Sequence, residues 1–193
     1  MSAKGSLRST DWWHLRRAAA SLRQGGVWAY PTEAVWGLGC DPWNRAAVDR
    51  ILALKERPEQ KGVILAAASI EQVAFLLEPL PAFLRETARR YWPGPTTLLL
   101  PDPDNQVPGW IKGEHDRVAI RVSAHAGVQR LCTAYGSPLV STSCNLAGRP
   151  PARWSWQVRR TFGDALDGIM PGSLGGAAQP SRILDPLDGR RLR

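Results

Sequence analysis

The sequence is poor in the residues that build metal centres and disulfide frameworks. It has three cysteines and three histidines among 193 residues. Cys40, Cys132 and Cys144 form no CxxC pair, and an odd number of cysteines makes a poor disulfide framework. The histidines lie far apart and form neither an HxxxH nor an HExxH pattern. The sequence therefore predicts no structural disulfide and no transition-metal site.

Long apolar runs are also missing. No run approaches the ~18 apolar residues that a membrane-spanning helix needs. Residues 1–25 carry scattered charges and lack the apolar segment of a signal peptide, so we expect no membrane contact and a cytoplasmic location. The chain shows neither internal repeats nor low-complexity segments. We therefore expect a single domain over residues 1–193, with its core over about residues 10–193.

Positive charge is in excess and is unevenly distributed. The chain has 25 Lys and Arg against 17 Asp and Glu, a formal net charge of +8. Residues 121–193 carry ten arginines against four aspartates, which gives +6 for this part. Such a balance attracts polyanions, either nucleotides or nucleic acid. A solvated basic surface that only keeps the protein soluble explains the same charge, so charge alone does not select a function.

Strand-like and helix-like segments alternate along the chain, which is typical of an α/β domain. Helix boundaries are marked by capping residues, glycines and prolines, including a capping box formed by Ser69 and Gln72. We expect helices at residues 10–24, 44–57, 69–77, 81–92, 125–135 and 154–165. We expect strands at residues 27–30, 63–66, 96–100, 118–122 and 138–142, and short strands near Ile169, Ile183 and residues 190–192. Residues 101–116 and 171–181 are rich in glycine and proline and are expected to be surface connections.

Polar groups and glycines gather where strands of the expected sheet end, and open α/β sheets bind ligands there. The first group is PTEAVWGLGCD at residues 31–41, in which a strand enters a turn that offers Thr32, Glu33 and two glycines. Glycine lets the backbone approach a ligand closely and leaves N–H groups free for it. A plain turn capped by Thr32 or Glu33 would have the same sequence, because a GxG spacing alone is a weak signal.

The second group is KERPEQK at residues 55–61, which places three cations where a helix breaks at Pro58. Lys55, Arg57 and Lys61 could surround a triphosphate through charge-assisted hydrogen bonds, each worth about 1.5–3 kcal/mol. They could equally be solvated cations that favour the C-terminal end of a helix dipole.

The third group is RVAIRV at residues 117–122. Strict alternation places Arg117, Ala119 and Arg121 on one face of the strand and the aliphatic residues on the other. An arginine within a strand needs an anionic partner, because an unpaired buried charge is very costly. The partner could be a carboxylate of the protein or of a substrate, and the guanidinium fork suits a carboxylate ligand.

The fourth group is STSCN at residues 141–145, directly after an apolar strand. Consecutive small polar side chains at a strand end suit contacts with an anion or a ribose. Ser141 has no suitable histidine or lysine partner nearby, which argues against a serine-hydrolase mechanism. Cys144 lacks the surroundings of a thiolate nucleophile, so we expect it to be a packing residue.

Together these groups resemble the TsaC/YrdC family of threonylcarbamoyl-AMP synthases. The resemblance extends from about Trp12 to Arg193 and is to the short, single-domain bacterial form. The matching segments are PTEAVWGLGCD, the KERPxxK cluster, WPGPTT at 92–97, VAIRV at 118–122, LVSTSCN at 139–145 and PSRILD at 180–185. Each segment alone would be weak evidence, but six of them in order across one short chain are a strong signal.

The resemblance implies an α/β fold, in which helices flank a twisted sheet of mixed strand direction around a basic concave cavity. It also implies a reaction. The amine of L-threonine takes up CO2 from bicarbonate, and the new carboxylate attacks the α-phosphorus of ATP to give threonylcarbamoyl-AMP and pyrophosphate. Such chemistry needs little acid–base assistance, so we expect catalysis by positioning and charge neutralisation, which fits the lack of a catalytic triad.

The resemblance assigns residues to the threonine end of this cavity. Thr32 would contact the threonine substrate, and Arg121 would hold its carboxylate. Ser141 and Ser181 would line the same end of the pocket.

The ATP end is implied to consist of cations and small polar residues. They are Lys55, Arg57, Lys61, Arg117, Ser143 and Asn145. The first three would grip the phosphates, with Mg2+ bridging the phosphates and no metal ligand from protein side chains. Ser143 and Asn145 would contact the nucleotide, and Arg117 is a weaker phosphate candidate.

The sequence departs from the family pattern at several positions. Ala34 stands where many relatives have Thr or Ser, and Val35-Trp36 where many have a Tyr. Ala66 occupies the position of a histidine that longer relatives place near threonine. Cys144 replaces the usual Ala, and Arg182 replaces a common Thr. These differences concern the threonine end of the pocket more than the ATP end.

Two other functions compete with this one. A double-stranded RNA-binding module that assists ribosomal RNA maturation would use the charge of residues 121–193 and bind in a salt-dependent manner without any need for threonine. A carbamoyl-adenylate-forming domain of the hydrogenase-maturation type shares the fold but works inside a much larger chain.

For the synthase, transfer of the threonylcarbamoyl group to adenosine 37 of tRNA would require partner tRNA threonylcarbamoyl transferase proteins. In addition, tRNA or double-stranded RNA could bind the basic face.

Overall fold

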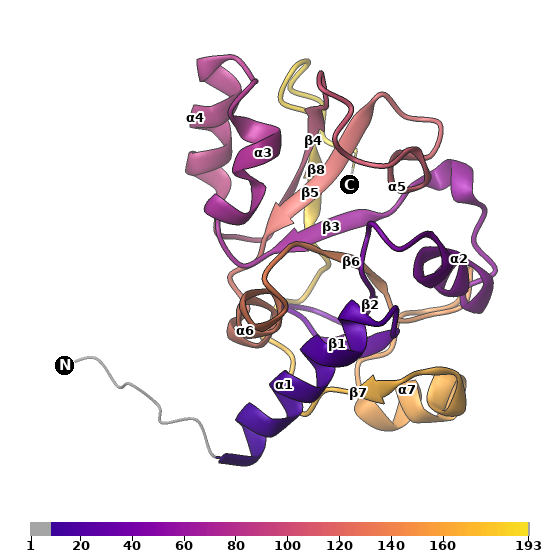
Figure 1. Cartoon of the computed structure of the whole chain (residues 1–193). Coiled ribbons are helices and arrows are strands. Elements are labelled where there is room, and N and C mark those ends of the chain that lie inside the picture. Colours follow the sequence, from indigo (N-terminus) through magenta and orange to yellow (C-terminus); the bar gives the residue numbers. More distant parts are fainter. Residues whose placement is uncertain (1–8, 193) are drawn as a thin grey trace.

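A computed structural model describes residues 9–192 of the chain (Figure 1). The α-helices are α1 (Ser9–Arg23), α2 (Arg45–Leu54), α3 (Ala74–Leu77), α4 (Ala82–Tyr91), α5 (Gly109–Lys112), α6 (Ala126–Tyr135) and α7 (Ser155–Phe162). Three 3-10 helices are η1 (Glu59–Lys61), η2 (Glu71–Val73) and η3 (Gly163–Ala165) within this range. The strands are β1 (Trp28–Pro31), β2 (Trp36–Gly39), β3 (Ile64–Ala67), β4 (Thr96–Pro101), β5 (Arg117–Val122), β6 (Leu139–Ser143), β7 (Gly168–Ile169) and β8 (Arg182–Leu184). Among these residues, no helix is both long enough and apolar enough to cross a bilayer.

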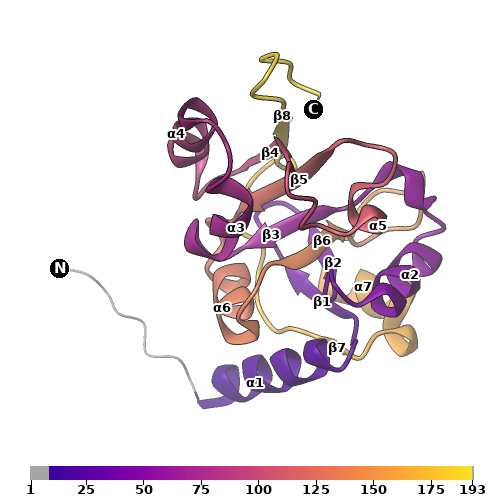
Figure 2. The ribbon, with the colours of Figure 1, turned by 45° about the horizontal axis from the view of Figure 1, so that its top comes forward.

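The eight strands within residues 9–192 form one sheet in the order β7-β1-β2-β6-β3-β5-β4-β8. The pairs β1–β2, β2–β6, β6–β3 and β5–β4 are antiparallel, whereas β7–β1, β3–β5 and β4–β8 are parallel. In the turned view of Figure 2, α1 lies below the sheet, α3 and α4 lie at the upper left, and α2 and α7 lie at the right. The arrangement confirms the expected α/β fold with a mixed sheet flanked by helices.

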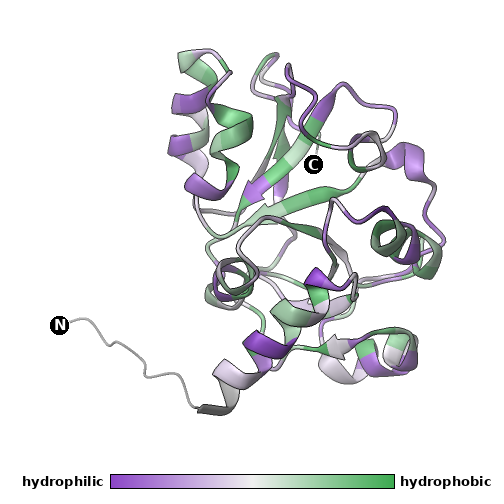
Figure 3. Ribbon diagram, in the orientation of Figure 1, coloured by the Kyte–Doolittle hydropathy of each residue, from purple (hydrophilic) through white to green (hydrophobic). Residues whose placement is uncertain are grey.

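The two faces of the sheet pack into two separate cores. The larger core joins α2, α3, α4, α5 and α7 to strand residues such as Leu65 and Val140. The smaller core joins α1 and α6 to strand residues such as Ala66 and Leu139. Neighbours along a strand enter different cores because successive side chains point to opposite faces. Figure 3 shows the central strands as largely apolar, except that β5 is hydrophilic toward both ends.

Helix boundaries follow the capping signals of the sequence. Asn44 accepts a hydrogen bond from the backbone N–H of Ala47 (3.1 Å) and begins α2. His125 caps α6 through its Nδ1 atom, which accepts from Val128 N (3.3 Å). Gly136 ends α6 in the left-handed conformation, with φ of 95°. These caps confirm the expected start of α2 and both expected limits of α6, whereas α2 ends at Leu54, before the expected residue 57.

The segment at residues 31–41 contains a strand that the sequence did not predict. Instead of a turn alone, it forms a β-hairpin in which β2 follows β1. The alternation of apolar and polar residues that predicts a strand is not visible in the sequence of β2, because Gly37 and Gly39 occupy one of its faces. A Cβ atom on Gly39 would lie 2.5 Å from Val140 O and 2.7 Å from Cε1 of Tyr30, so only glycine lets the tyrosine ring cross the hairpin here.

Other expectations fail at segment ends. The helix expected at residues 69–77 is divided into η2 and α3, and the predicted capping box is wrong. Gln72 instead accepts from Ala68 N (2.8 Å) and donates to Cys132 O (2.9 Å), so its side chain joins this segment to α6. The expected connection at residues 101–116 contains α5, and residues 190–192 contribute a single bridge to β8.

Candidate active site

A cavity of about 780 Å3 lies on the sheet face that carries the smaller core, in the part of this face that α1 and α6 leave uncovered. Its floor consists of alternate residues of neighbouring strands. Ile64 of β3 pairs with Ser141 of β6, and Leu99 of β4 pairs with Ala119 of β5. Since side chains alternate along a strand, Arg117 and Arg121 face the cavity together with Ala119, as the sequence predicted.

The cavity brings together most residues that the sequence singled out. Those that line it are Thr32, Arg57, Lys61, Arg117, Arg121, Ser141, Ser143 and Ser181. Lys55 and Asn145 are not among the lining residues. The order of strands in the sheet explains why these residues meet in one cavity. Strands from distant parts of the chain are consecutive neighbours there, in the order β2, β6, β3, β5, β4 and β8.

One end of the cavity is built around a buried ion pair. The side chain of Arg121 is 7% exposed, and its Nη1 atom lies 3.3 Å from Oε2 of Glu33. The other carboxylate oxygen of Glu33 accepts a hydrogen bond from Oγ of Ser123 (2.7 Å). Nε of Arg121 and Oε2 of Glu33 are buried and make no hydrogen bond. We call this region, with Thr32 and Ser141, the Arg121 end.

Hydroxyl groups surround this ion pair. Oγ1 of Thr32 donates to Val35 O (2.7 Å), which closes the turn of the hairpin and fixes the threonine side chain. Oγ of Ser181 lies 3.0 Å from Oγ1 of Thr97. The Arg121 end therefore offers a guanidinium, a carboxylate and several small hydroxyls within one region of the cavity lining.

The other end of the cavity, the Arg57 end, is formed by the loop before β3. The guanidinium of Arg57 donates to Gly62 O (2.8 Å) and to Lys61 O (3.2 Å), so it orders this loop as well as facing the cavity. The side chain of Lys61 is exposed. Burial lowers the pKa of Arg57. Gly62, which Arg57 contacts, precedes β3, and Arg121 pairs with Ala66 near the end of β3. The four residues from Gly62 to Ala66, at about 3.3 Å per residue, place the two ends about 13 Å apart.

Two glycines bring α5 against this loop. A Cβ atom on Gly62 would lie 2.6 Å from Lys112 O, and one on Gly113 would lie 2.3 Å from Gln60 O. Both glycines have positive φ angles of 58° and 66°. The close approach places Lys112 in the cavity lining, where Asp102 pairs with its ammonium at 3.0 Å.

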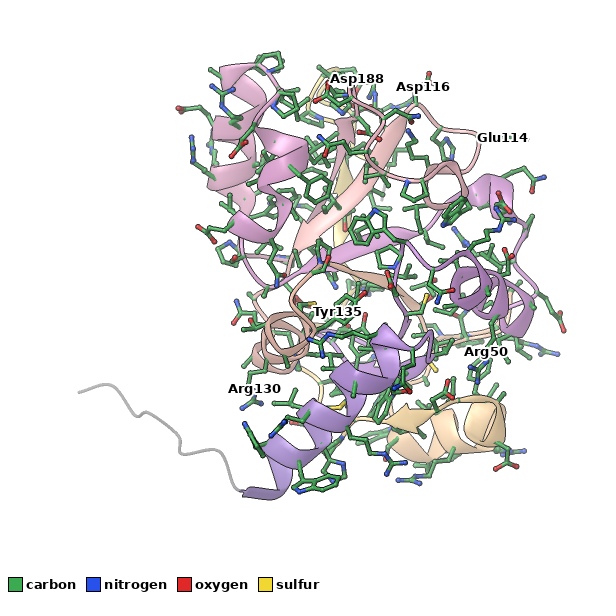
Figure 4. All side chains as sticks on the ribbon, in the orientation of Figure 1. Arg50, Glu114, Asp116, Arg130, Tyr135 and Asp188 are labelled. Atoms are coloured by element: carbon green, nitrogen blue, oxygen red, sulfur yellow. The ribbon has the colours of Figure 1, made fainter. Side chains whose placement is uncertain are left out.

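Arg117 also has a carboxylate partner from the protein. Its Nη1 atom pairs with Asp185, whose side chain is 4% exposed. The sequence left open whether the two arginines of β5 meet protein or substrate carboxylates, and the structure gives each of them a protein partner. Further acidic residues, Glu114, Asp116 and Asp188, lie on the upper side of the molecule in Figure 4 and line the cavity as well.

The segment at residues 171–181 is more than the surface connection that its composition suggested. It connects β7 and β8, which lie at opposite edges of the sheet, so it must cross the whole sheet. On its way, Gly175 N donates to Thr32 O (3.0 Å) and Ala177 N donates to Glu33 O (2.9 Å). Its last residues, Pro180 and Ser181, line the cavity. We call this segment the crossing loop.

Lys55 and Asn145 form a buried link next to the cavity. The ammonium of Lys55 donates to Asn145 O (2.8 Å), to Oδ1 of Asn145 (3.2 Å) and, at short range, to Ser143 O. Oδ1 of Asn145 also accepts from Oγ of Ser143 (2.6 Å). In this structure the two residues therefore hold the loop that carries Ser143.

Replacing Lys55 with methionine is expected to change how stability depends on pH. Burial lowers the pKa of Lys55 to about 8, whereas an unfolded lysine titrates near ~10.4. Between these values the unfolded chain binds more protons than the folded protein, so the wild type gains stability as pH rises. Urea unfolding near pH 7.5 and pH 10 should show the wild type gaining stability relative to Lys55→Met. An equal difference at both pH values would contradict this.

Most departures from the family pattern lie away from the cavity lining. Ala34 lines the cavity, whereas Ala66 is fully buried in the smaller core. Nε of Arg182 donates to Oγ1 of Thr96 (2.7 Å), and its guanidinium lies over the ring of Tyr91. Burial raises the pKa of the Cys144 thiol to about 12, as expected for a packing residue.

Two carboxylates that pair with arginines of the cavity were missed at the level of the sequence. Glu33 was noted as a carboxylate of the first polar group or as a turn cap, without a partner, and Asp185 only as the last letter of PSRILD. Their pairing with Arg121 and Arg117 depends on the sheet and the crossing loop, which no local spacing reveals. Within residues 9–192, no group of three His, Cys, Asp or Glu side chains could hold a metal ion.

Comparison with known proteins gives consistent results. The profile of the Sua5, YciO and YrdC family, described as telomere recombination, matches residues 20–193. The chain is 60% identical to a threonylcarbamoyl-AMP synthase of Marinobacter nauticus, over 96% of this chain and 97% of the relative. It is 54% identical to a threonylcarbamoyl-AMP synthase of Halorhodospira halophila, over 93% of each protein.

A solved structure shows the same fold. The crystal structure of P. abyssi Sua5 complexed with L-threonine superposes with a TM-score of 0.83 at 35% identity. The match covers 90% of this chain and 51% of the Sua5 chain. The family profile and the relatives agree with each other, and the chain belongs to the Sua5/YciO/YrdC family.

Proposed function

We propose that this protein is a threonylcarbamoyl-AMP synthase, which forms threonylcarbamoyl-AMP and pyrophosphate from L-threonine, bicarbonate and ATP. One observation carries the proposal: a single cavity combines a guanidinium with hydroxyls at the Arg121 end and cations at the Arg57 end. The first set suits a hydroxylated amino acid, and the second suits phosphates. Relatives at 60% and 54% identity bear the name of this enzyme.

At the Arg121 end, Arg121 would bind the carboxylate of threonine through its guanidinium fork. Thr32, Ser141 and Ser181 would surround the rest of the amino acid. The P. abyssi relative was crystallised with L-threonine, which supports an amino acid as the ligand. Held in this way, the amine would lie one carbon atom from the bound carboxylate and be open to the cavity, where CO2 from bicarbonate can react with it.

At the Arg57 end, Arg57 and Lys61 would bind the phosphates of ATP. Ser143 lies on β6 two residues beyond the Ser141–Ile64 pair, toward the Arg57 end, and would contact the nucleotide. Lys55 and Asn145 are proposed to support ATP binding by holding the Ser143 loop, the contacts that the structure gives them. Arg117, which Asp185 already pairs, would be a weaker phosphate ligand. Mg2+ would enter with ATP, because the described residues contain no cluster of metal-binding side chains.

The chemistry then needs position more than proton transfer. The new carbamate carboxylate must approach the α-phosphorus of ATP, and the cavity would hold both next to each other. Such positioning can supply about 7–11 kcal/mol of the barrier. Cations at the Arg57 end would stabilise the charge of the departing pyrophosphate. A protein with this mechanism needs no catalytic triad.

The transfer step and its location are further proposals. The threonylcarbamoyl group would pass to adenosine 37 of tRNA on partner transferase proteins in the cytoplasm. The three relatives named above are not RNA-binding modules by name, and no feature of the described residues favours that alternative over the enzyme. The enzyme is therefore the better account of the cavity.

Pyrophosphate release tests this proposal directly. The protein is supplied with ATP, Mg2+ and bicarbonate, with L-threonine, with L-serine or with no amino acid. We expect release that depends on threonine and is much weaker with serine. No release with any amino acid, together with salt-sensitive binding of double-stranded RNA, would instead support the RNA-binding module.

A further inference from the structure

The charges of the cavity form two different arrangements. At the Arg57 end, Arg57 donates to backbone carbonyls, and within residues 9–192 neither Arg57 nor Lys61 forms an ion pair with a carboxylate. At the Arg121 end, Arg121 is paired with Glu33 at 3.3 Å. One end therefore presents net positive charge, and the other presents a balanced pair of opposite charges.

The Glu33–Arg121 pair is held in place from several sides. Ser123 is fully buried, and its hydroxyl donates to Glu33 while accepting from His125 N (3.1 Å). The crossing loop fixes the backbone of Glu33 through Ala177 N (2.9 Å). The position of the carboxylate beside Arg121 is thus determined by two separate segments of the chain, residues 121–125 and the crossing loop.

The pair is also incompletely satisfied. Nε of Arg121 and Oε2 of Glu33 are both buried without a hydrogen bond, although most buried polar atoms in proteins have one. Both residues line the cavity. The Nε–H donor of the buried Arg121 is unused, and Oε2 of Glu33 has only its 3.3 Å contact with Nη1 of Arg121. Two opposite charges held in this way, side by side at a cavity wall, point to a ligand that carries both charges.

We infer that Glu33 determines specificity by making the Arg121 end selective for a zwitterionic amino acid over simple anions; this inference rests on the proposed function and deepens it. An α-amino acid carries its carboxylate and its ammonium one carbon atom apart. Arg121 attracts the first, and the negative charge of Glu33 beside it favours the second. Without Glu33, Arg121 would be an unpaired cation open to any anion, including the phosphates of ATP.

The arrangement also explains how two substrates that both carry anionic groups are kept apart. ATP is a polyanion, and the carboxylate of Glu33 repels it from the Arg121 end. Within residues 9–192, neither Arg57 nor Lys61 forms an ion pair with a carboxylate, so both remain available for the phosphates. Glu33 thus sorts the two substrates to the two ends of the cavity.

Glu33→Gln tests the inference, because it removes the charge and keeps a side chain of the same shape that can still bond to Ser123. The probes are L-threonine and the 2,3-dihydroxybutyrate of matching stereochemistry, which has the carboxylate and the hydroxyl but no ammonium. Binding is measured by calorimetry without ATP. We expect the wild type to prefer threonine and the preference to fall by about tenfold or more in Glu33→Gln, as for loss of one charge-assisted interaction.

The strongest support for the inference would be a gain of inhibition in the variant. Added pyrophosphate should compete with threonine, and this inhibition should be stronger in Glu33→Gln than in the wild type. A protein that was merely damaged by the substitution would not show stronger inhibition. Glu86→Gln, on the exposed side of α4, is the matched control and should behave as the wild type. An unchanged preference in a folded Glu33→Gln protein would overturn the inference.

Two further measurements keep the outcomes distinct. If Glu33→Gln does not fold, Ser123→Ala keeps the charge but removes the bond that orients it, and it should reduce the preference for threonine partially; an undiminished preference would contradict the inference. If the wild type binds threonine selectively but releases no pyrophosphate, the proposed function fails while the inference stands. If the wild type binds no threonine, both fail.

Discussion

Replacing Arg121 with alanine is expected to lower kcat/KM for threonine by about a hundredfold or more, since two charge-assisted hydrogen bonds of about 1.5–3 kcal/mol each are lost. Binding of ATP should change little, because the phosphates are proposed to lie at the Arg57 end. The measurement is threonine-dependent pyrophosphate release, with ATP binding measured separately by calorimetry. A variant that keeps its threonine dependence would contradict the proposed role of Arg121.

Stability complicates this variant, and a second one separates the two effects. Arg121→Ala leaves Glu33 buried without its partner, which costs about 3–5 kcal/mol in comparable buried pairs. The double variant Arg121→Met with Glu33→Gln removes both charges, so most of the unfolding free energy should return while activity stays low. If activity returned together with stability, the loss in Arg121→Ala would be structural and not a loss of substrate binding.

Replacing Lys61 with alanine is expected to impair the use of ATP and to leave stability nearly unchanged, in contrast to Arg121→Ala. Its side chain is exposed, so the free energy of unfolding should change by about 0.5 kcal/mol or less. The KM for ATP should rise about tenfold or more, because one charge-assisted contact with a phosphate is lost. Pyrophosphate release measured over a range of ATP concentrations, at saturating threonine, gives this value.

Two controls sharpen the result for Lys61. Arg89→Ala removes an exposed cation from α4, away from the cavity lining, and should leave the KM for ATP unchanged. Higher ionic strength should reduce the difference between the wild type and Lys61→Ala, since salt screens an exposed charge. An equal effect of both substitutions would indicate general attraction of ATP by net charge and not a site at Lys61.

Local signals in the sequence were enough to place most elements. Asn44 and Gly136 mark the ends of helices because capping is decided within one turn of the chain. The alternation in RVAIRV correctly gave the face of β5 because side-chain direction in a strand depends only on residue parity. The signals failed where glycines occupied one face of β2 and where Gln72 bonded to α6 instead of forming a capping box.

The candidate site shows the same division. The sequence placed eight of its ten proposed residues in what proved to be one cavity lining. Lys55 is the instructive exception, because its position in a run of cations predicts a phosphate ligand. The structure instead buries its ammonium among the oxygens of the Ser143 loop. Whether a lysine meets solvent or backbone carbonyls depends on a loop 88 to 90 residues away, which its own neighbours in the sequence do not report.

The sequence by itself determined the α/β class, the face of the arginines on β5 and the gathering of cations and small polar residues at strand ends. These properties follow from composition and from periodicities that act over a few residues. Only the tertiary structure decided which carboxylate pairs with which arginine and that the crossing loop joins the site. The physical reason is that an ion pair needs its charged atoms within about 4 Å of each other, so the pairing is decided by the order of strands in the sheet and by how the crossing loop returns over it.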